Sequence, residues 1–277
     1  MRTKIIGPNV ATASATERDV VGPVLGMSIE EMSDLAKTIL VTTPHRSSEG
    51  MNAGLYYNAG HWARFGMAYA GFEDQFGGFI ELSRYGIVRH FLDYAKDRPE
   101  IDKLIMVDAD ENVPWDSPFR LAAWDKPVVS GIICNFSQAK GAYACVQFKD
   151  KYGSARFPSS QFTKKIPGRG LKEAHSVGTG LVCIKKVVLE TIIAGGDYPF
   201  RIPEDVRDSC FETGTMKQGE DIAFSHQCEK YGFQRYVDFS VRGEHYKTLP
   251  IGWPRGDVDY DLDAAEWTVD ERDFLHG

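Results

Sequence analysis

Three carboxylates directly follow an apolar run in "IDKLIMVDADENVP", residues 101–114. The run Lys103 to Val107 has the composition of a buried strand, and Asp108, Asp110 and Glu111 come immediately after it. Alternate residues of a strand lie on the same side, so Asp108 and Asp110 could reach one hard cation, which could also bind phosphate oxygens. The other interpretation is a solvated turn with an aspartate cap.

An Asp-x-Asp (DXD) pair is weak evidence alone, because "DVDYDLD" near the C-terminus contains overlapping copies with no apolar strand before them. Other parts of the chain add residues of the right chemistry. "SVGTGLVCIKKVVLE" carries Gly178, Thr179 and Gly180 before an apolar run, where small residues let a substrate approach the backbone. In "QGEDIAFSHQ", Glu220 and Asp221 occupy the first turn of a predicted helix, where acidic residues also serve simply to stabilise the helix.

The elements that must position these residues alternate along the chain. Strands are predicted at residues 38–43, 77–82, 103–107, 126–134, 180–184 and 235–241, and the last of these leads into "GEHYK". Helices are predicted at 52–70, 84–98, 117–124, 185–193 and 219–232, with Ser117 as the N-cap of the third. This alternation predicts an α/β fold with a mostly parallel central sheet and helices on both faces. In such sheets ligands bind at the carboxyl ends of the strands, where Asp108 and Asp110 are expected.

Length and composition set the broad class. A chain of 277 residues with 43% hydrophobic residues can form one large α/β domain or two small ones. It has no run of about 18 apolar residues and no signal-like N-terminus, so we expect a cytoplasmic protein with no membrane partner. The five cysteines form no Cys-x-x-Cys pair, which argues against a disulfide framework or a structural zinc site.

The order of these motifs resembles the nucleotide-sugar-dependent glycosyltransferases of the GT-A fold. In that family an Asp-x-Asp ends a central strand, a Gly-rich loop and a Glu-Asp pair at a helix start follow, and a C-terminal histidine completes the metal site. The resemblance covers roughly Thr38 to Lys247. It implies a hexosyl- or pentosyltransferase with an N-terminal arm at 1–36, a glycosyltransferase domain at 37–250 and an acidic C-terminal tail at 251–277.

The same resemblance implies a donor site. Asp110 and His245 would ligate a divalent metal, and Asp108 would contact the donor ribose or share the metal. A cation there would neutralise charge that develops on the nucleoside diphosphate leaving group. The imidazole ligand favours Mn²⁺ (manganese) over Mg²⁺. Lys247 would assist the diphosphate.

Further site residues follow from the family pattern. Thr43, Pro44 and His45, after the first strand, would hold the nucleotide base. Residues 178–180 would form the Gly-rich loop on the acceptor side. Asp221 would act as general base in an inverting enzyme, with Glu220 beside it, whereas in retaining members the pair positions substrates.

Charge is distributed unevenly. Residues 149–186 contain nine Lys and Arg against two acids, a net charge of +7, in a chain whose total is −7. Because the basic residues are interleaved with aromatic ones, we expect this segment either to bind modified DNA as the acceptor, as in enzymes that glycosylate viral hydroxymethylated bases, or to line the diphosphate site or face water. A protein, glycan or small molecule is the alternative acceptor.

Two other classes of protein compete with the glycosyltransferase. A sugar-nucleotide nucleotidyltransferase would need a basic Gly-rich loop after the first strand, where the chain offers Arg46 alone. A non-catalytic binding module would not need the intact acidic residues.

Overall fold

The structure is a computed structural model that describes residues 26–45, 53–73, 80–137, 141–149, 155–156, 170–202 and 219–245. All of these belong to one compact unit, Met1–Tyr246. The predicted acidic tail and most of the predicted N-terminal arm lie outside the described residues. The last part of that arm forms helix α2 (Ile29–Ala36), which begins with a capping box between Ser28 and Glu31.

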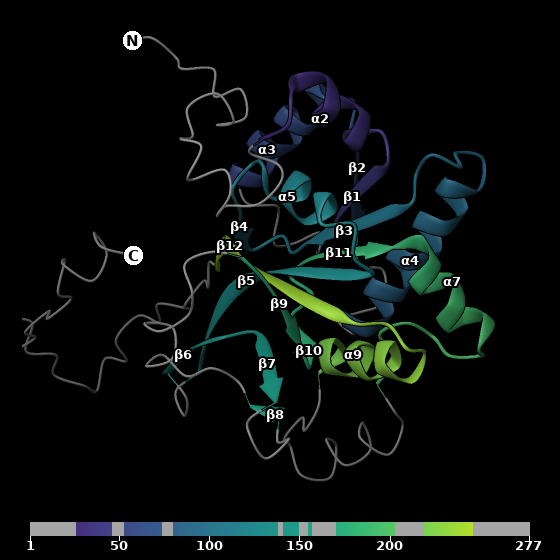
Figure 1. Ribbon diagram of the computed structural model, residues 1–277, viewed down its shortest axis with the longest axis vertical. Helices are drawn as coiled ribbons and strands as arrows, with labels where there is room; N and C mark the ends of the chain where they lie inside the picture. Colours follow the sequence, from purple (N-terminus) through teal and green to yellow (C-terminus); the bar gives the residue numbers. More distant parts are fainter. Residues whose placement is uncertain are drawn as a thin grey trace, which may run out of the picture. The chain divides into compact units, whose positions relative to one another are not determined.

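A nine-stranded sheet forms the centre of the unit, with its main strands in the order β2-β1-β3-β11-β5-β12-β4 (Figure 1). β1 pairs in parallel with β2 and β3, and β5 pairs in parallel with β12. β11 runs antiparallel between β3 and β5, so β2, β1, β3, β5 and β12 all point the same way. The predicted α/β class with a mostly parallel central sheet is therefore confirmed. The strands of this path are β1 (Ile39–His45), β2 (Ala68–Glu73), β3 (Lys103–Val107), β4 (Glu111–Asn112), β5 (Val128–Ser137), β11 (Leu181–Lys185) and β12 (Arg235–His245).

Shorter strands extend the sheet and form a second one. β6 (Gly141–Ala144) pairs with β5, and β9 (Leu171–Ala174) pairs with β12. β10 (Ser176–Val177), β7 (Val146–Lys149) and β8 (Ala155–Arg156) form a separate three-stranded sheet. The sequence patterns did not predict these five strands.

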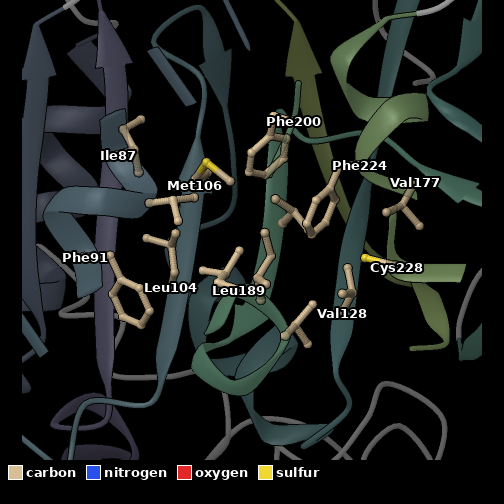
Figure 2. Packing of buried hydrophobic residues seen from close by; sticks show 14 of the residues in the cluster. Ile87, Phe91, Leu104, Met106, Val128, Val177, Leu189, Phe200, Phe224 and Cys228 are labelled. Carbon is tan, nitrogen blue, oxygen red and sulfur yellow. The ribbon is translucent and has the colours of Figure 1, made fainter. Parts of the chain in front are cut away.

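Helices cover both faces of the central sheet, because alternate residues of each buried strand point to opposite sides. Leu104 and Met106 of β3 pack in a core with α4 (Ile80–Lys96), α7 (Lys186–Ala194) and α9 (Glu220–Lys230). Figure 2 shows this core, with Ile87 and Phe91 of α4 beside the two β3 residues. Ile105 and Val107 belong to the second core, with α2, α3 (Ala53–Arg64) and α5 (Ser117–Ala123). Within the described residues, no helix is long and apolar enough to cross a membrane.

Three local predictions are wrong. The helix predicted at 52–70 ends at Arg64, since Gly66 takes a left-handed conformation (φ 81°) and the chain then enters β2. The strand predicted at 77–82 is replaced over its described part by the first turn of α4, because a short apolar run does not by itself distinguish strand from helix. The N-cap of α5 is Asp116 and not Ser117.

Candidate active site

The turn after β3 is held by backbone hydrogen bonds to two neighbouring segments. The Asp108 N–H donates to the Gly180 carbonyl (2.8 Å), and the Glu111 N–H donates back to the Asp108 carbonyl (3.1 Å). β4 then pairs with the end of β12, where Glu111 lies opposite His245. The turn thus sits at the carboxyl end of β3, between the Gly-rich loop and the end of the last strand.

Asp110 and His245 come together although they are 135 residues apart. The His245 Nε2 and Asp110 Oδ2 atoms are 2.8 Å apart. The imidazole is 13% exposed and the carboxylate 49% exposed. His245 is brought here because β12 shifts register against β5 between Val237 and Arg242. That irregularity contains the buried carboxylate of Asp238, which accepts hydrogen bonds from Ser240 and from the Trp124 indole.

The predicted metal ligands are only partly assembled by the protein itself. Among the described residues, no group of three or more His, Cys, Asp and Glu side chains is arranged to hold a metal ion. Asp110 and His245 supply one carboxylate and one imidazole, a pair that substrate oxygens and water would have to complete. Asp108 instead directs its Oδ2 to an arginine, and its Oδ1 is buried without a hydrogen-bond partner in the described part of the chain.

Arg84 of α4, which the sequence analysis missed, connects the predicted motifs. Its Nη2 donates to Asp108 Oδ2 (2.9 Å), its Nε to Glu220 Oε1 (3.1 Å) and its Nη1 to the Thr179 carbonyl (3.2 Å). The side chain is 3% exposed. Two carboxylates around the guanidinium offset its burial and raise its pKa further. One buried cation therefore links β3, the Gly-rich loop and α9.

The sequence did contain a signal for Arg84. Arg84, Ile87, Val88 and Phe91 follow the helical spacing i, i+3, i+4, i+7, so the arginine lies on the apolar stripe that faces the sheet. A charged residue on such a stripe must be paired, because an unpaired buried charge is costly. Residue patterning could thus have identified Arg84, although not its partners.

The two acidic residues at the start of α9 have different surroundings. Glu220 Oε1 accepts hydrogen bonds from Arg84 and from the Thr179 hydroxyl (3.4 Å), so its position is fixed. Asp221 Oδ1 accepts from the Ile222 N–H (2.7 Å). Burial and the neighbouring Glu220 carboxylate raise the pKa of Asp221 to about 6. Burial also raises the pKa of Asp108, against the opposing effect of Arg84.

The Gly-rich loop is closely packed. A side chain at Gly180 would collide with the Glu111 carboxylate and approach Asp108 Oδ2 to 3.2 Å. At Gly178 a Cβ would lie 2.7 Å from the Cys145 carbonyl. The predicted reason for these glycines was the approach of a substrate, whereas the structure shows protein groups that already occupy the space.

The remaining predicted site residues are only partly described. Thr43 and Pro44 are buried near the end of β1, and His45 is the last residue of that strand. The side chain of His45 and all of Lys247 lie outside the described residues. The basic segment is described only at 149, 155–156 and 170–186.

Comparisons with known proteins find similarity in solved structures alone. No protein-family model and no curated protein matches the sequence. A197 from STIV is similar with 18% identity and a TM-score of 0.45, over 76% of this chain and 86% of that one. GalNAc-T7 with UDP, GalNAc and Mn²⁺ is similar with 12% identity and a TM-score of 0.44, over 79% of this chain and 45% of that one. A glycosyltransferase involved in the glycosylation of the major capsid of PBCV-1 is similar with 13% identity and a TM-score of 0.30, over 64% of this chain and 75% of that one. At these values the comparisons assign neither an activity nor a substrate.

Proposed function

We propose that the chain is a metal-dependent GT-A glycosyltransferase that moves a hexosyl or pentosyl group from a nucleoside-diphosphate sugar to an acceptor. The main support is the gathering of distant motifs at the carboxyl end of β3. Asp108 pairs with Arg84 and accepts no bond from His245, whereas Asp110 pairs with His245. The Gly-rich loop and the Glu-Asp pair are joined to the same cluster through Arg84.

On the donor side, Asp110 and His245 would hold Mn²⁺ or Mg²⁺. The cation would supply positive charge next to the leaving diphosphate and so lower the barrier to its departure. Asp108 has one oxygen engaged by Arg84 and the other, buried Oδ1, available to accept a hydrogen bond from a ribose hydroxyl. Thr43, Pro44 and His45 would hold the base, and Lys247 the diphosphate.

On the acceptor side, Asp221 would accept the proton of the attacking hydroxyl. A pKa of about 6 leaves it ionised at neutral pH and makes it a stronger base than an ordinary aspartate. Glu220 is held by Arg84 and Thr179, so in this proposal it positions the start of α9 and does not itself react.

The acceptor class is proposed from charge alone. Residues 149–186, with their net charge of +7, would contact the phosphates of modified DNA. Each phosphate contact on duplex DNA should add about −0.9 to the slope of log affinity against log salt. A DNA titration of the wild type and of the Lys164→Ala/Lys165→Ala/Arg169→Ala variant measures that slope. Without salt-dependent binding by the wild type, a protein, glycan or small-molecule acceptor replaces DNA in the proposal.

The activity itself is tested with a panel of UDP-, GDP-, CDP- and ADP-sugars in Mn²⁺, with the products identified by mass spectrometry. Release of free sugar and nucleoside diphosphate from one donor supports glycosyl transfer with water as a slow acceptor. Formation of a sugar nucleotide and pyrophosphate from a sugar phosphate and a nucleoside triphosphate would identify a nucleotidyltransferase instead. The Asp110→Asn variant is the control for contaminating hydrolases.

A further inference from the structure

We propose that Arg84 is a positioning residue that fixes the donor-side carboxylate Asp108 and the start of α9, which carries Asp221, relative to each other. This inference rests on the proposed function for the roles of the two ends, and on the structure for the link between them. Arg84 contacts neither end through the backbone. Its side chain bonds directly to both, and the Thr179 hydroxyl adds a longer contact to Glu220 Oε1 (3.4 Å).

The geometry of the guanidinium restricts where its acceptors can lie. Arginine presents its N–H donors in a rigid planar fork, so acceptors bonded to different nitrogens are held at fixed relative positions. Here Nη2 bonds to Asp108, Nε to Glu220 and Nη1 to the Thr179 carbonyl, all at 2.9–3.2 Å. These acceptors lie on three segments that are distant in sequence, since Thr179 and Glu220 are 41 residues apart and Asp108 is farther from both. Moving one acceptor therefore strains the bonds to the others.

Arg84 is also shielded from direct contact with a substrate. The Arg84 side chain is 3% exposed, and each of its three nitrogens already donates to a protein oxygen. Because the guanidinium is buried, a substrate phosphate has little access to it. Arg84 consequently acts through Asp108 and Glu220, and not by direct contact with a substrate.

Arg84 also balances the negative charge of two carboxylates. The Glu220 side chain is 15% exposed and that of Asp108 is 24% exposed. Without the guanidinium these two carboxylates would face each other in a region of low dielectric with like charge. They would move apart, and this movement would displace the first turn of α9. Asp221 is the next residue of that turn.

A second link joins α9 to β10, directly before the Gly-rich loop. The Val177 N–H donates to Ser225 Oγ (3.2 Å), and Ser225 Oγ in turn donates to the Asp221 carbonyl (2.9 Å). This contact holds the second turn of α9 even when Arg84 is changed. We therefore expect a change at Arg84 to loosen the start of α9 and leave the rest of the helix in place.

The test uses the full chain and four variants. Arg84→Lys keeps the charge but cannot span three acceptors with one nitrogen. Arg84→Met removes the charge, and Arg84→Met/Glu220→Met also removes one of the two carboxylates that would lose their partner, which lessens the cost to the fold. Arg89→Met is the matched control, because Arg89 is an exposed arginine on the same helix.

Hydrogen exchange measured by mass spectrometry tests the link without any substrate. In Arg84→Lys, amides at 179–181 and 219–223 should exchange at least about tenfold faster, while those of β3 and β5 and the whole of Arg89→Met stay at wild-type rates. Unchanged exchange in Arg84→Lys overturns the proposal. A uniform increase over the whole chain also overturns it, because it indicates general destabilisation.

Kinetics with the donor that the panel of nucleotide sugars identifies tests the functional consequence. Arg84→Lys should lower turnover by about tenfold and weaken binding of the matching nucleoside diphosphate with Mn²⁺ by a similar factor, since both ends depend on it. In an Asp221→Asn background the same substitution should lower turnover by less than about twofold, because the base is already lost. Independent, multiplying losses would contradict positioning of Asp221. If no donor is hydrolysed, the proposed function fails while the exchange result still decides the structural link.

Discussion

The two ends of strand β3 handle charge in opposite ways. At its start, Lys103 pairs with Asp102 (2.7 Å), and close by in the next strand Lys185 pairs with Asp125 (2.7 Å). At its end, acidic residues gather around the Arg84 guanidinium and the His245 imidazole; they are Asp108, Asp110, Glu111, Glu220 and Asp221. One end is balanced pair by pair and the other has an excess of negative charge.

This difference in charge balance indicates which end of β3 is the better candidate for a functional site. The partly exposed pair of Lys185 and Asp125 contributes little to stability, and the buried Lys103 is neutralised by Asp102 beside it. Burial and the neighbouring Glu220 carboxylate raise the pKa of Asp221, and an excess of negative charge costs stability unless a cation binds. The carboxyl end of β3 is therefore the place where removal of a charge should change activity most.

The largest effect is expected from the proposed metal pair. Asp110→Asn or His245→Ala should lower donor hydrolysis by on the order of a thousandfold, because the loss of a bound cation forfeits several kcal/mol of transition-state stabilisation. The matched substitution at the other end, Lys185→Ala, breaks a surface pair and should leave turnover unchanged. Steady-state hydrolysis assays of all three compare the two ends. Equal losses at both ends would remove the contrast.

A smaller loss is expected at the proposed base. Asp221→Asn should lower turnover by about a hundredfold and leave nucleotide affinity in Mn²⁺ nearly intact, because it removes proton transfer and not donor binding. Since the base must be ionised, wild-type turnover should rise with pH and level off above about pH 6. Turnover measured from pH 5 to 8 should rise in this way for the wild type, whereas the variant should show no such rise. A variant with wild-type turnover would return Asp221 to a purely helix-stabilising role.

Packing at the Gly-rich loop gives an effect on stability. Gly180→Ala places a methyl group against the Glu111 carboxylate and should destabilise the fold by about 1–3 kcal/mol. Gly60→Ala on α3 is the control, because nothing lies within 4 Å of its added Cβ; it should stabilise the helix by roughly 0.5–1 kcal/mol. Urea unfolding of both variants measures the difference. A stabilised Gly180→Ala would show that this loop is loosely packed.

The excess of charge also predicts how stability depends on pH. The folded-state pKa of Asp221, about 6, exceeds its ordinary value of 3.8, so the folded chain binds the proton more tightly than the unfolded chain. Ionised Asp221 therefore costs stability above about pH 6, and this cost disappears as the pH falls to about 4. As the pH rises from 4 to 6, the free energy of unfolding of the wild type should fall by roughly 1–2 kcal/mol relative to that of Asp221→Asn. Urea unfolding at pH 4, 5, 6 and 7 gives both curves, and parallel curves would contradict the raised pKa.

Sequence patterning predicted the core of the fold better than its edges. The strand at 103–107 and the helix that follows "GLVCI" are continuous apolar or strongly periodic segments, and both are observed. The segment 77–82 is too short for its hydrophobic periodicity to distinguish a strand from a helix, and its described part is helical. Strands β6 to β10 are short and pair locally, so their residues carry too little patterning to be recognised.

For the candidate site, the sequence predicted which residues belong to it but not which of them contact one another. Asp108, Asp110, Glu220, Asp221 and His245 were identified from their types and order, but which of them meet depends on tertiary contacts. The pairing of Asp110 with His245 requires the register shift in β12, and the engagement of Asp108 and Glu220 requires Arg84. Neither a strand irregularity nor a buried ion pair has a local sequence period, which explains why the arrangement could not be derived from the chain alone.

The most direct test of the central claim is calorimetric titration of the wild type with UDP, GDP, CDP and ADP, each with Mn²⁺ and again with excess chelator. If Asp110 and His245 hold a cation that binds the diphosphate, one nucleotide should bind in Mn²⁺, and its affinity should fall by at least about a hundredfold in chelator and in His245→Ala. Binding of equal strength in Mn²⁺, in chelator and in His245→Ala would contradict the claim that the carboxyl end of β3 is a metal-dependent nucleotide site.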